Sequence, residues 1–188
     1  MESVCEHLDL DLHGPADAGD VAGRLGCQLP EELRVIESAV VDPSEPSISE
    51  ALRAAHYRVT FHEEGWGEEE LTRRVNAFLA AERAVVTRAA HSKARPGKRH
   101  PKIAERAGRE IDLKEIVTHL AVEGPDSVAF SLRADPSGSA KPAEVLAAVF
   151  GDGVPPRGVK VLKEGVSFAR TTRSGPRAQP RAPRYLDA

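Results

Sequence analysis

The sequence predicts an α+β fold of the ferredoxin-like, split βαβ kind, with helices on one face of an antiparallel sheet. Two observations predict it. Residues 56–169 show apolar periods typical of strand, helix, two or three strands, helix and strand, in that order. Residues 1–41, which precede this region, show only a partial strand, helix and strand unit. We therefore expect one larger domain with a smaller α+β piece in front of it.

The N-terminal piece begins with an alternating pattern. Leucines at positions 8, 10 and 12 alternate with polar residues over residues 5–13, and a period of two predicts a half-buried strand. A short helical pattern carrying Val21 and Leu25 follows, and residues 33–41 predict a second strand. Such a piece leaves a sheet edge unpaired, and unpaired edges invite self-association.

Residues 42–55 read as a linker that ends in a short helix, because Ser47 and Glu50 have the spacing of a capping box. The region 56–169 then carries the larger domain. Its expected elements are a strand at 56–62, a helix at 68–83, a strand at 84–89, a hairpin of 116–123 and 127–134, a helix at 142–150 and a strand at 158–169.

The charge is divided unevenly along the chain. The formal net charge of -3 is the sum of -10 over residues 1–90 and +7 over residues 91–188. A loop at 88–109 holds the densest basic stretch, and a basic tail at 170–188, which we expect to be disordered, holds another. Such clusters attract nucleic acid, so we take these residues as candidate phosphate contacts: Arg88, Lys93, Arg95, Lys98, Arg99, Lys102, Arg106 and Arg109.

Composition excludes several classes of protein. No apolar run is long enough to cross a bilayer, and the first residues do not form a secretory signal, so we expect a cytoplasmic protein with no membrane role. The two cysteines, Cys5 and Cys27, cannot supply the three thiolates of a radical-type iron–sulfur cluster and are expected to be structural thiols. No phosphate-binding glycine loop or hydrolase motif is present, and we expect no cofactor.

Two further groups of residues suggest chemistry. The imidazoles of His91, His100 and His119 are more simply solvated or phosphate-contacting groups than metal ligands, since no carboxylate or thiolate stands at ligand spacing. Asp112 lies close to Lys114 and Glu115, which is the nearest approach to an acid/base constellation. The simpler interpretation of Asp112 is the N-cap of a short turn.

Four collinear blocks carry a resemblance: HLDLDLHGPADAGDVAGRLGCQLPEELRVIES, SISEALRAAHYRVTF, EIDLKEIVTHLAVE and KPAEVLAAVFG. In this order they resemble the bacterial radical-SAM-linked, or radical-SAM-associated, proteins, a domain of unknown function, over about residues 5–169. The resemblance implies an accessory role beside a B12-binding radical SAM protein in RNA-related chemistry such as tRNA modification. The layout is also similar to that of pseudouridine synthases.

The chain departs from that family in two ways. It lacks the strand, helix and basic segment that the family places upstream, so we expect a truncated form or a misassigned start. It also has Lys114 where the family tends to have Arg, which removes bidentate phosphate recognition there.

The sequence leaves three alternative functions open. The first is a non-catalytic accessory protein that helps a radical SAM partner engage RNA through its basic segment. The second is a stand-alone RNA-modifying enzyme with pseudouridine-synthase-like architecture, and the third is a protein–protein adaptor. The basic segment contains no aromatic residue for base stacking, so any RNA binding is expected to depend little on sequence.

Overall fold

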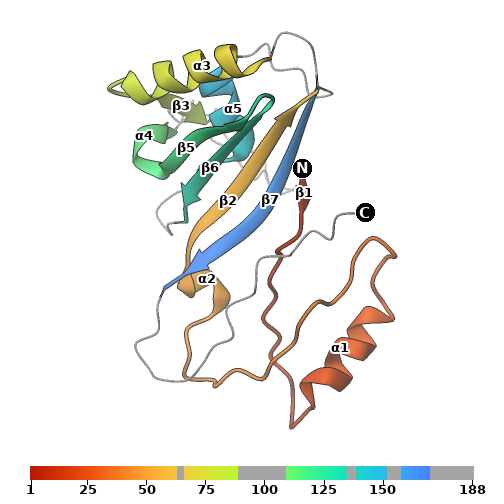
Figure 1. The fold of residues 1–188 in the computed structure, drawn as a ribbon. Helices are drawn as coiled ribbons and strands as arrows, with labels where there is room; N and C mark the ends of the chain where they lie inside the picture. Colours follow the sequence, from red (N-terminus) through yellow and green to blue (C-terminus); the bar gives the residue numbers. More distant parts are fainter. Residues whose placement is uncertain (63–65, 89–108, 135–138, 152–157, 170–188) are drawn as a thin grey trace, which may run out of the picture.

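Five strands form the main sheet, in the order β1-β7-β2-β6-β5 (Figure 1). The structure, a computed structural model, describes residues 1–62, 66–88, 109–134, 139–151 and 158–169. The strands of this sheet are β1 (Glu2–Ser3), β2 (Leu52–Phe61), β5 (Val117–Gly124), β6 (Ser127–Arg133) and β7 (Val159–Phe168).

The pairing of these strands gives the split βαβ topology. β2 pairs antiparallel with both β6 and β7, and β5 pairs antiparallel with β6. β5 therefore runs parallel to β2 with β6 between them, and β7 runs parallel to β6 with β2 between them. Each parallel pair is connected through a helix, namely α3 (Glu68–Ala80) or α5 (Pro142–Phe150). The predicted α+β, ferredoxin-like class is confirmed.

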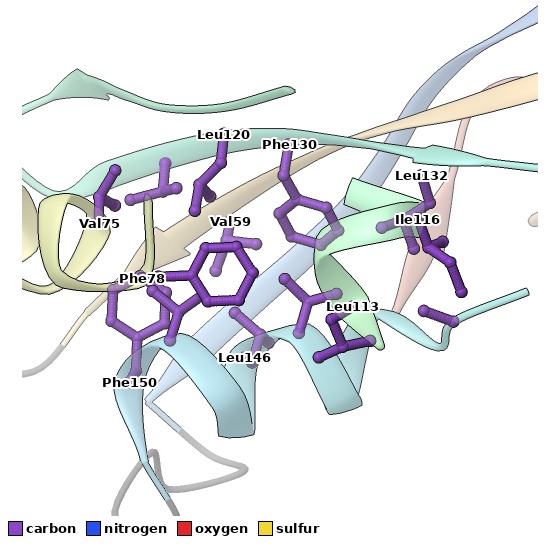
Figure 2. Close-up of a cluster of buried hydrophobic side chains, with 14 of the residues drawn as sticks. Val59, Val75, Phe78, Leu113, Ile116, Leu120, Phe130, Leu132, Leu146 and Phe150 are labelled. Atoms are coloured by element: carbon purple, nitrogen blue, oxygen red, sulfur yellow. The ribbon is translucent and has the colours of Figure 1, made fainter. Parts of the chain in front are cut away.

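One face of the main sheet carries the hydrophobic core. Strand residues such as Val59 and Phe130 point toward α3, α5 and the short helix α4 (Leu113–Ile116), as Figure 2 shows. Aromatic rings join the layers, because Phe61 of β2 lies edge-on to Phe150 of α5 with ring centroids 4.9 Å apart. The largest fully buried side chains are Phe130, Leu71, Leu113, Val59, Val128 and Val145.

Local sequence explains the two long helices of this core. The first turn of α3 holds three consecutive glutamates, which the helix macrodipole favours there. α5 begins with Pro142 and ends before Gly151, whose positive φ of 81° suits glycine. The expected helix boundaries in this domain are confirmed within a few residues.

The N-terminal residues form less regular structure than we expected. α1 (Ala18–Gly26) is present and is capped by Asp17, and the predicted capping box of Ser47 and Glu50 opens α2 (Ile48–Ala51). The strands predicted at 5–13 and 33–41 are wrong, because only Glu2–Ser3 finds a partner, β7. An alternating pattern forms a strand only when another strand supplies hydrogen bonds.

A second, two-stranded sheet corrects another expectation. The strand predicted at 84–89 forms as β3 (Val85–Arg88), but it pairs with β4 (Arg109–Asp112) outside the main sheet. The sequence analysis did not identify β4. The expected disorder of the tail at 170–188 concerns residues outside the described part. Within the described ranges, no helix is long and apolar enough to cross a membrane.

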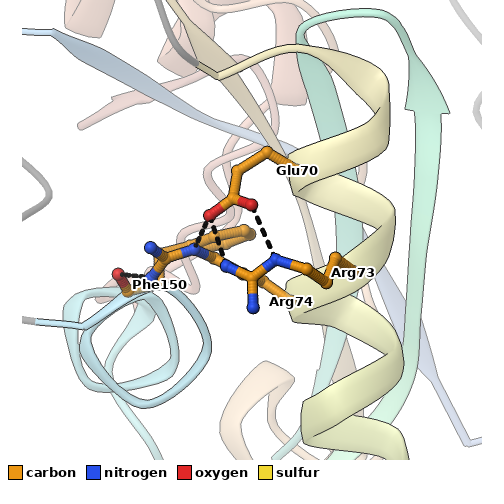
Figure 3. Close-up of polar contacts among 4 residues, drawn as sticks. All are labelled: Glu70, Arg73, Arg74 and Phe150. Carbon is orange, nitrogen blue, oxygen red and sulfur yellow. Dashed lines mark hydrogen bonds and ion pairs between the residues drawn. The ribbon is translucent and has the colours of Figure 1, made fainter.

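An arginine fastens α3 to the end of α5. Glu70 accepts hydrogen bonds from Arg73 and Arg74, and Arg74 also donates to the carbonyl of Phe150 (Figure 3). The Arg74 guanidinium lies 5.0 Å from the centroid of the Trp66 ring. Hydrogen bonds from Arg73 and Arg74 lower the pKa of Glu70 from 4.5 to about 2.

Two leucines on α3 test the position of the core. Leu71 is completely buried, whereas the side chain of Leu79 is 49% exposed. We expect Leu71→Ala to lower the free energy of unfolding by about 2–5 kcal/mol, because it leaves a cavity. Leu79→Ala is the matched control and should change it by less than about 1 kcal/mol. Urea unfolding measures both values, and equal losses would contradict the packing described.

The lowered pKa of Glu70 predicts a pH dependence. A carboxylate whose pKa falls on folding stabilises the fold above its ordinary value of 4.5, and this stabilisation is lost as the pH falls toward about 2. We therefore expect the parent to melt at a higher temperature than Glu70→Gln at neutral pH, with the difference vanishing near pH 2. Glu69→Gln removes an adjacent exposed charge from the same helix turn and should show a much smaller difference, because only the interaction with the helix dipole is lost.

Candidate nucleic-acid interface

The basic segment begins and ends on neighbouring strands. β3 and β4 pair from Val85 opposite Asp112 to Arg88 opposite Arg109. The two end positions of the candidate phosphate-binding set are thereby brought together across the small sheet. The other six residues lie outside the described residues: Lys93, Arg95, Lys98, Arg99, Lys102 and Arg106. We call the pair of β3 and β4 the stem.

An ion pair attaches the upper end of the stem to α5. The guanidinium of Arg88 donates to both carboxylate oxygens of Glu144, over 2.6 and 2.5 Å, and to the carbonyl of Ser139 over 2.6 Å. These hydrogen bonds lower the pKa of Glu144, which therefore stays ionised at neutral pH. Arg88 thus has a structural partner, and its predicted contact with phosphate stays a prediction. Arg109 is exposed on β4.

Asp112 holds the lower end of the stem. Its carboxylate accepts from the backbone N–H groups of Ala84 and Lys114, over 3.0 and 3.1 Å, and from Arg83 over 3.3 Å. Hydrogen bonding, first of all from Ala84, lowers the pKa of Asp112. The expected N-cap is therefore confirmed, since Asp112 caps α4 and joins it to the start of β3.

Lys114 also has a structural partner. Its Nζ donates to the carbonyls of Phe78 and Leu79 at the end of α3, over 3.1 and 2.9 Å, and lies 5.1 Å from the centroid of the Phe78 ring. A cation at a helix C-terminus satisfies carbonyls that have no partner within the helix. Asp112 and Lys114 therefore have structural roles. Their contacts do not assemble them with Glu115 into an acid/base group.

The sheet face opposite the core carries a polar cluster that the sequence analysis missed. The imidazole of His56 bridges two hydroxyls, with Nδ1 2.8 Å from Ser131 Oγ and Nε2 2.7 Å from Ser167 Oγ. One residue further along this face of β2, Arg58 lies 2.6 Å from both Glu123 and Glu164. The hydrogen bond with Glu164 raises the pKa of Arg58.

Only part of this cluster was visible in the sequence. Tyr57, Val59 and Phe61 alternate on the core side of β2, and this alternation places His56 and Arg58 on the other face. Their partners come from β5, β6 and β7, and strand register decides which of those residues meet. The contacts use both ring nitrogens of His56 and balance one arginine against two carboxylates. They join the strands of the sheet across its polar face.

Of the candidate metal ligands, one lies in the described part of the chain, and so do both cysteines. His119 is an exposed residue on β5, while His91 and His100 lie outside the described residues. Among the residues that the structure describes, no three His, Cys, Asp or Glu side chains converge as a metal site. Cys5 and Cys27 are free thiols, and burial raises the pKa of Cys5.

Comparison with known proteins identifies a family. Neither the curated proteins nor the solved structures contain a significant match to the chain. A family model with the description "Uncharacterized protein conserved in bacteria (DUF2344)" matches residues 1–142. The matched range ends at the start of α5, so most of this helix and the sheet strand β7 lie beyond it. Because the match spans well over half of the chain, the protein belongs to this bacterial DUF2344 family.

Proposed function

We propose that the protein is a cytoplasmic accessory protein that assists a partner radical SAM enzyme in RNA modification by binding the RNA backbone. The basic segment at 88–109 supports this proposal, because eight of its residues are Lys or Arg and only one is acidic. The B12-binding radical SAM partner and a tRNA substrate follow from the family resemblance. The two cysteines cannot hold a radical-type cluster, so the partner would supply that chemistry.

The anchored stem is the observation that carries the RNA-binding part. The stem that carries the basic segment is attached at both of its own ends, at the upper end through Arg88 and Glu144 and at the lower end through Asp112 and Ala84. Cations held near one site release more counterions from a nucleic acid than the same cations spread over the surface, because they can contact adjacent phosphates together. A stem of two paired strands is a suitable support for such a segment.

Removing cations from this segment tests the proposal. We expect replacement of Lys93, Arg95, Lys98 and Arg99 together by Ala to weaken binding to a transfer RNA. The slope of log affinity against log salt should fall by at most about 3 to 4, from about 0.7–0.9 for each lost phosphate contact. Filter binding at several salt concentrations measures the slope. An unchanged slope, or no salt-sensitive binding by the parent, would refute the RNA-binding role.

A charge-matched control distinguishes a specific role of this segment from an effect of the protein's net charge. Arg24, Arg34, Arg53 and Arg133 are exposed positions outside the basic segment, so their joint replacement by Ala removes the same four charges. We expect this control to keep most of the parental salt slope. Both variants should melt close to the parent, because all eight replaced side chains are Lys or Arg, which are rarely part of a hydrophobic core.

The Arg88–Glu144 ion pair gives a prediction that opposes simple electrostatics. Glu144→Gln adds one positive charge to the protein, so attraction by net charge alone predicts tighter RNA binding. If anchoring of the stem matters, loss of the bidentate contact between Arg88 and Glu144 should instead weaken RNA binding, by roughly two- to tenfold. Asp126→Asn makes the same charge change on the β5–β6 turn and serves as the control. Tighter binding by Glu144→Gln would show that the anchor plays no part.

Turnover distinguishes the accessory role from the stand-alone enzyme. The purified chain should leave a transfer RNA chemically unchanged when nucleosides are analysed by mass spectrometry. Formation of pseudouridine or another modified nucleoside by the chain alone would support the enzymatic alternative. The adaptor alternative would be supported by a chain that binds no RNA at any salt concentration.

A further inference from the structure

The N-terminal residues leave large apolar side chains exposed, whereas later residues of the chain bury theirs in the core. No residue from 1 to 50 is buried, whereas the core contains many large apolar side chains of later residues. Exposed large apolar residues are concentrated at the N-terminus: Met1, Val4, Leu8, Leu10, Leu12, Leu33, Ile36, Val40 and Val41. Large apolar side chains left exposed in such number are typical of a region that a partner covers.

The backbone in this region also has free hydrogen-bonding capacity. Figure 1 shows the chain leaving β1, at the edge of the main sheet, as a drawn-out segment that runs to α1. Backbone hydrogen bonds to β7 end at Val4, and side chains of Cys5 and Glu6 make the last hydrogen bonds to Lys163 of β7. Within the described residues the backbone of 6–13 makes no backbone–backbone hydrogen bond. Residues 6–13 therefore follow the edge strand β1 with alternating leucines, are not themselves part of the sheet, and leave their backbone available to an added strand.

The acidic charge of residues 1–41 limits the kinds of partner that can bind to their exposed apolar side chains. Residues 1–41 contain nine acidic residues and two arginines. RNA is repelled by this surface, so the exposed leucines are not part of the phosphate-binding site. Two of the acidic residues, Asp9 and Asp11, alternate with the leucines themselves.

A second copy of the chain is also a poor fit. If residues 6–13 paired antiparallel with themselves about Leu10, Asp9 of each copy would face Asp11 of the other. Like charges directly opposite each other destabilise a strand pair. A strand that alternates basic and apolar side chains, in contrast, would match both the leucines and the aspartates.

We propose that residues 1–41 form a docking surface for a protein partner that adds a strand with alternating basic and apolar side chains along residues 6–13. Its backbone would pair with residues 6–13 beyond β1, and its apolar side chains would cover Leu8, Leu10 and Leu12. Its cations would face Asp11 and Asp9, whose carboxylate also accepts a hydrogen bond from the backbone N–H of Ile48 over 2.7 Å. This surface consists of other residues than the basic segment at 88–109, so the inference goes beyond the proposed RNA binding and does not require it.

Defined peptides test this proposal with the full-length chain. The probe is a blocked, fluorescently labelled peptide of alternating Lys and Val, and its affinity is measured by anisotropy. We expect it to bind the parent, and the joint Leu8→Ser, Leu10→Ser and Leu12→Ser variant to bind at least about tenfold more weakly. Asp11→Asn, which leaves the contact of Asp9 with Ile48 in place, should weaken binding at low salt, with a smaller effect at high salt.

Matched controls separate strand addition from simple charge attraction. A Lys–Val peptide with a central Pro keeps the charge but cannot complete the ladder, and it should bind less tightly. Glu68→Gln with Glu69→Gln removes two exposed acidic charges from α3 and should leave the affinity unchanged. The leucine variant should retain the parental melting temperature, because all three leucines are exposed.

Three results would overturn the proposal. The first is undiminished peptide binding by the leucine variant, and the second is equal binding of a Glu–Val peptide. The third is a dimer of the parent in light scattering that the leucine substitutions dissociate, which would identify a second copy as the occupant. Loss of RNA binding with retained peptide binding would refute the proposed function alone.

Discussion

The burial of one face of the main sheet beneath α3 and α5 is the constraint on which the rest of the structure depends. Val59 of β2, Phe130 of β6 and Leu71 of α3 are each at most 1% exposed, and they join the two layers. Both helical connections lie on this face, so each brings the chain back to a strand two positions away in the sheet. Packing, more than any polar contact, therefore sets the strand order.

Polar side chains then complete the helix ends and attach the inserted stem. Arg74 binds the last carbonyl of α5, Lys114 binds the last carbonyls of α3, and Asp112 caps α4. Arg88 and Glu144 connect the stem to α5. Residues whose sequence pattern suggested chemistry are thus used largely to satisfy backbone groups, which are costly to bury without partners.

The two proposed interactions occupy oppositely charged parts of the chain. The basic segment connects two anchored strands, whereas the acidic residues 1–41 carry unburied leucines and, at 6–13, a backbone without backbone partners among the described residues. Nucleic acid and a basic protein strand would each be repelled by the other's site. An accessory protein that connects an RNA to a partner needs such a division, because the two ligands must not compete.

The sequence by itself determined the local elements of residues 56–169, their α+β class, the caps at Ser47 and Asp112 and the concentration of charge at 88–109. These depend on periodicity and on contacts between near neighbours, which a sequence displays directly. Tertiary structure decided the separate pairing of β3 with β4, the absence of strands at 5–13 and 33–41, and the bridge from His56 to Ser131 and Ser167. Each of these depends on which distant strand lies alongside, because a strand's hydrogen bonds and cross-strand neighbours come from another part of the chain.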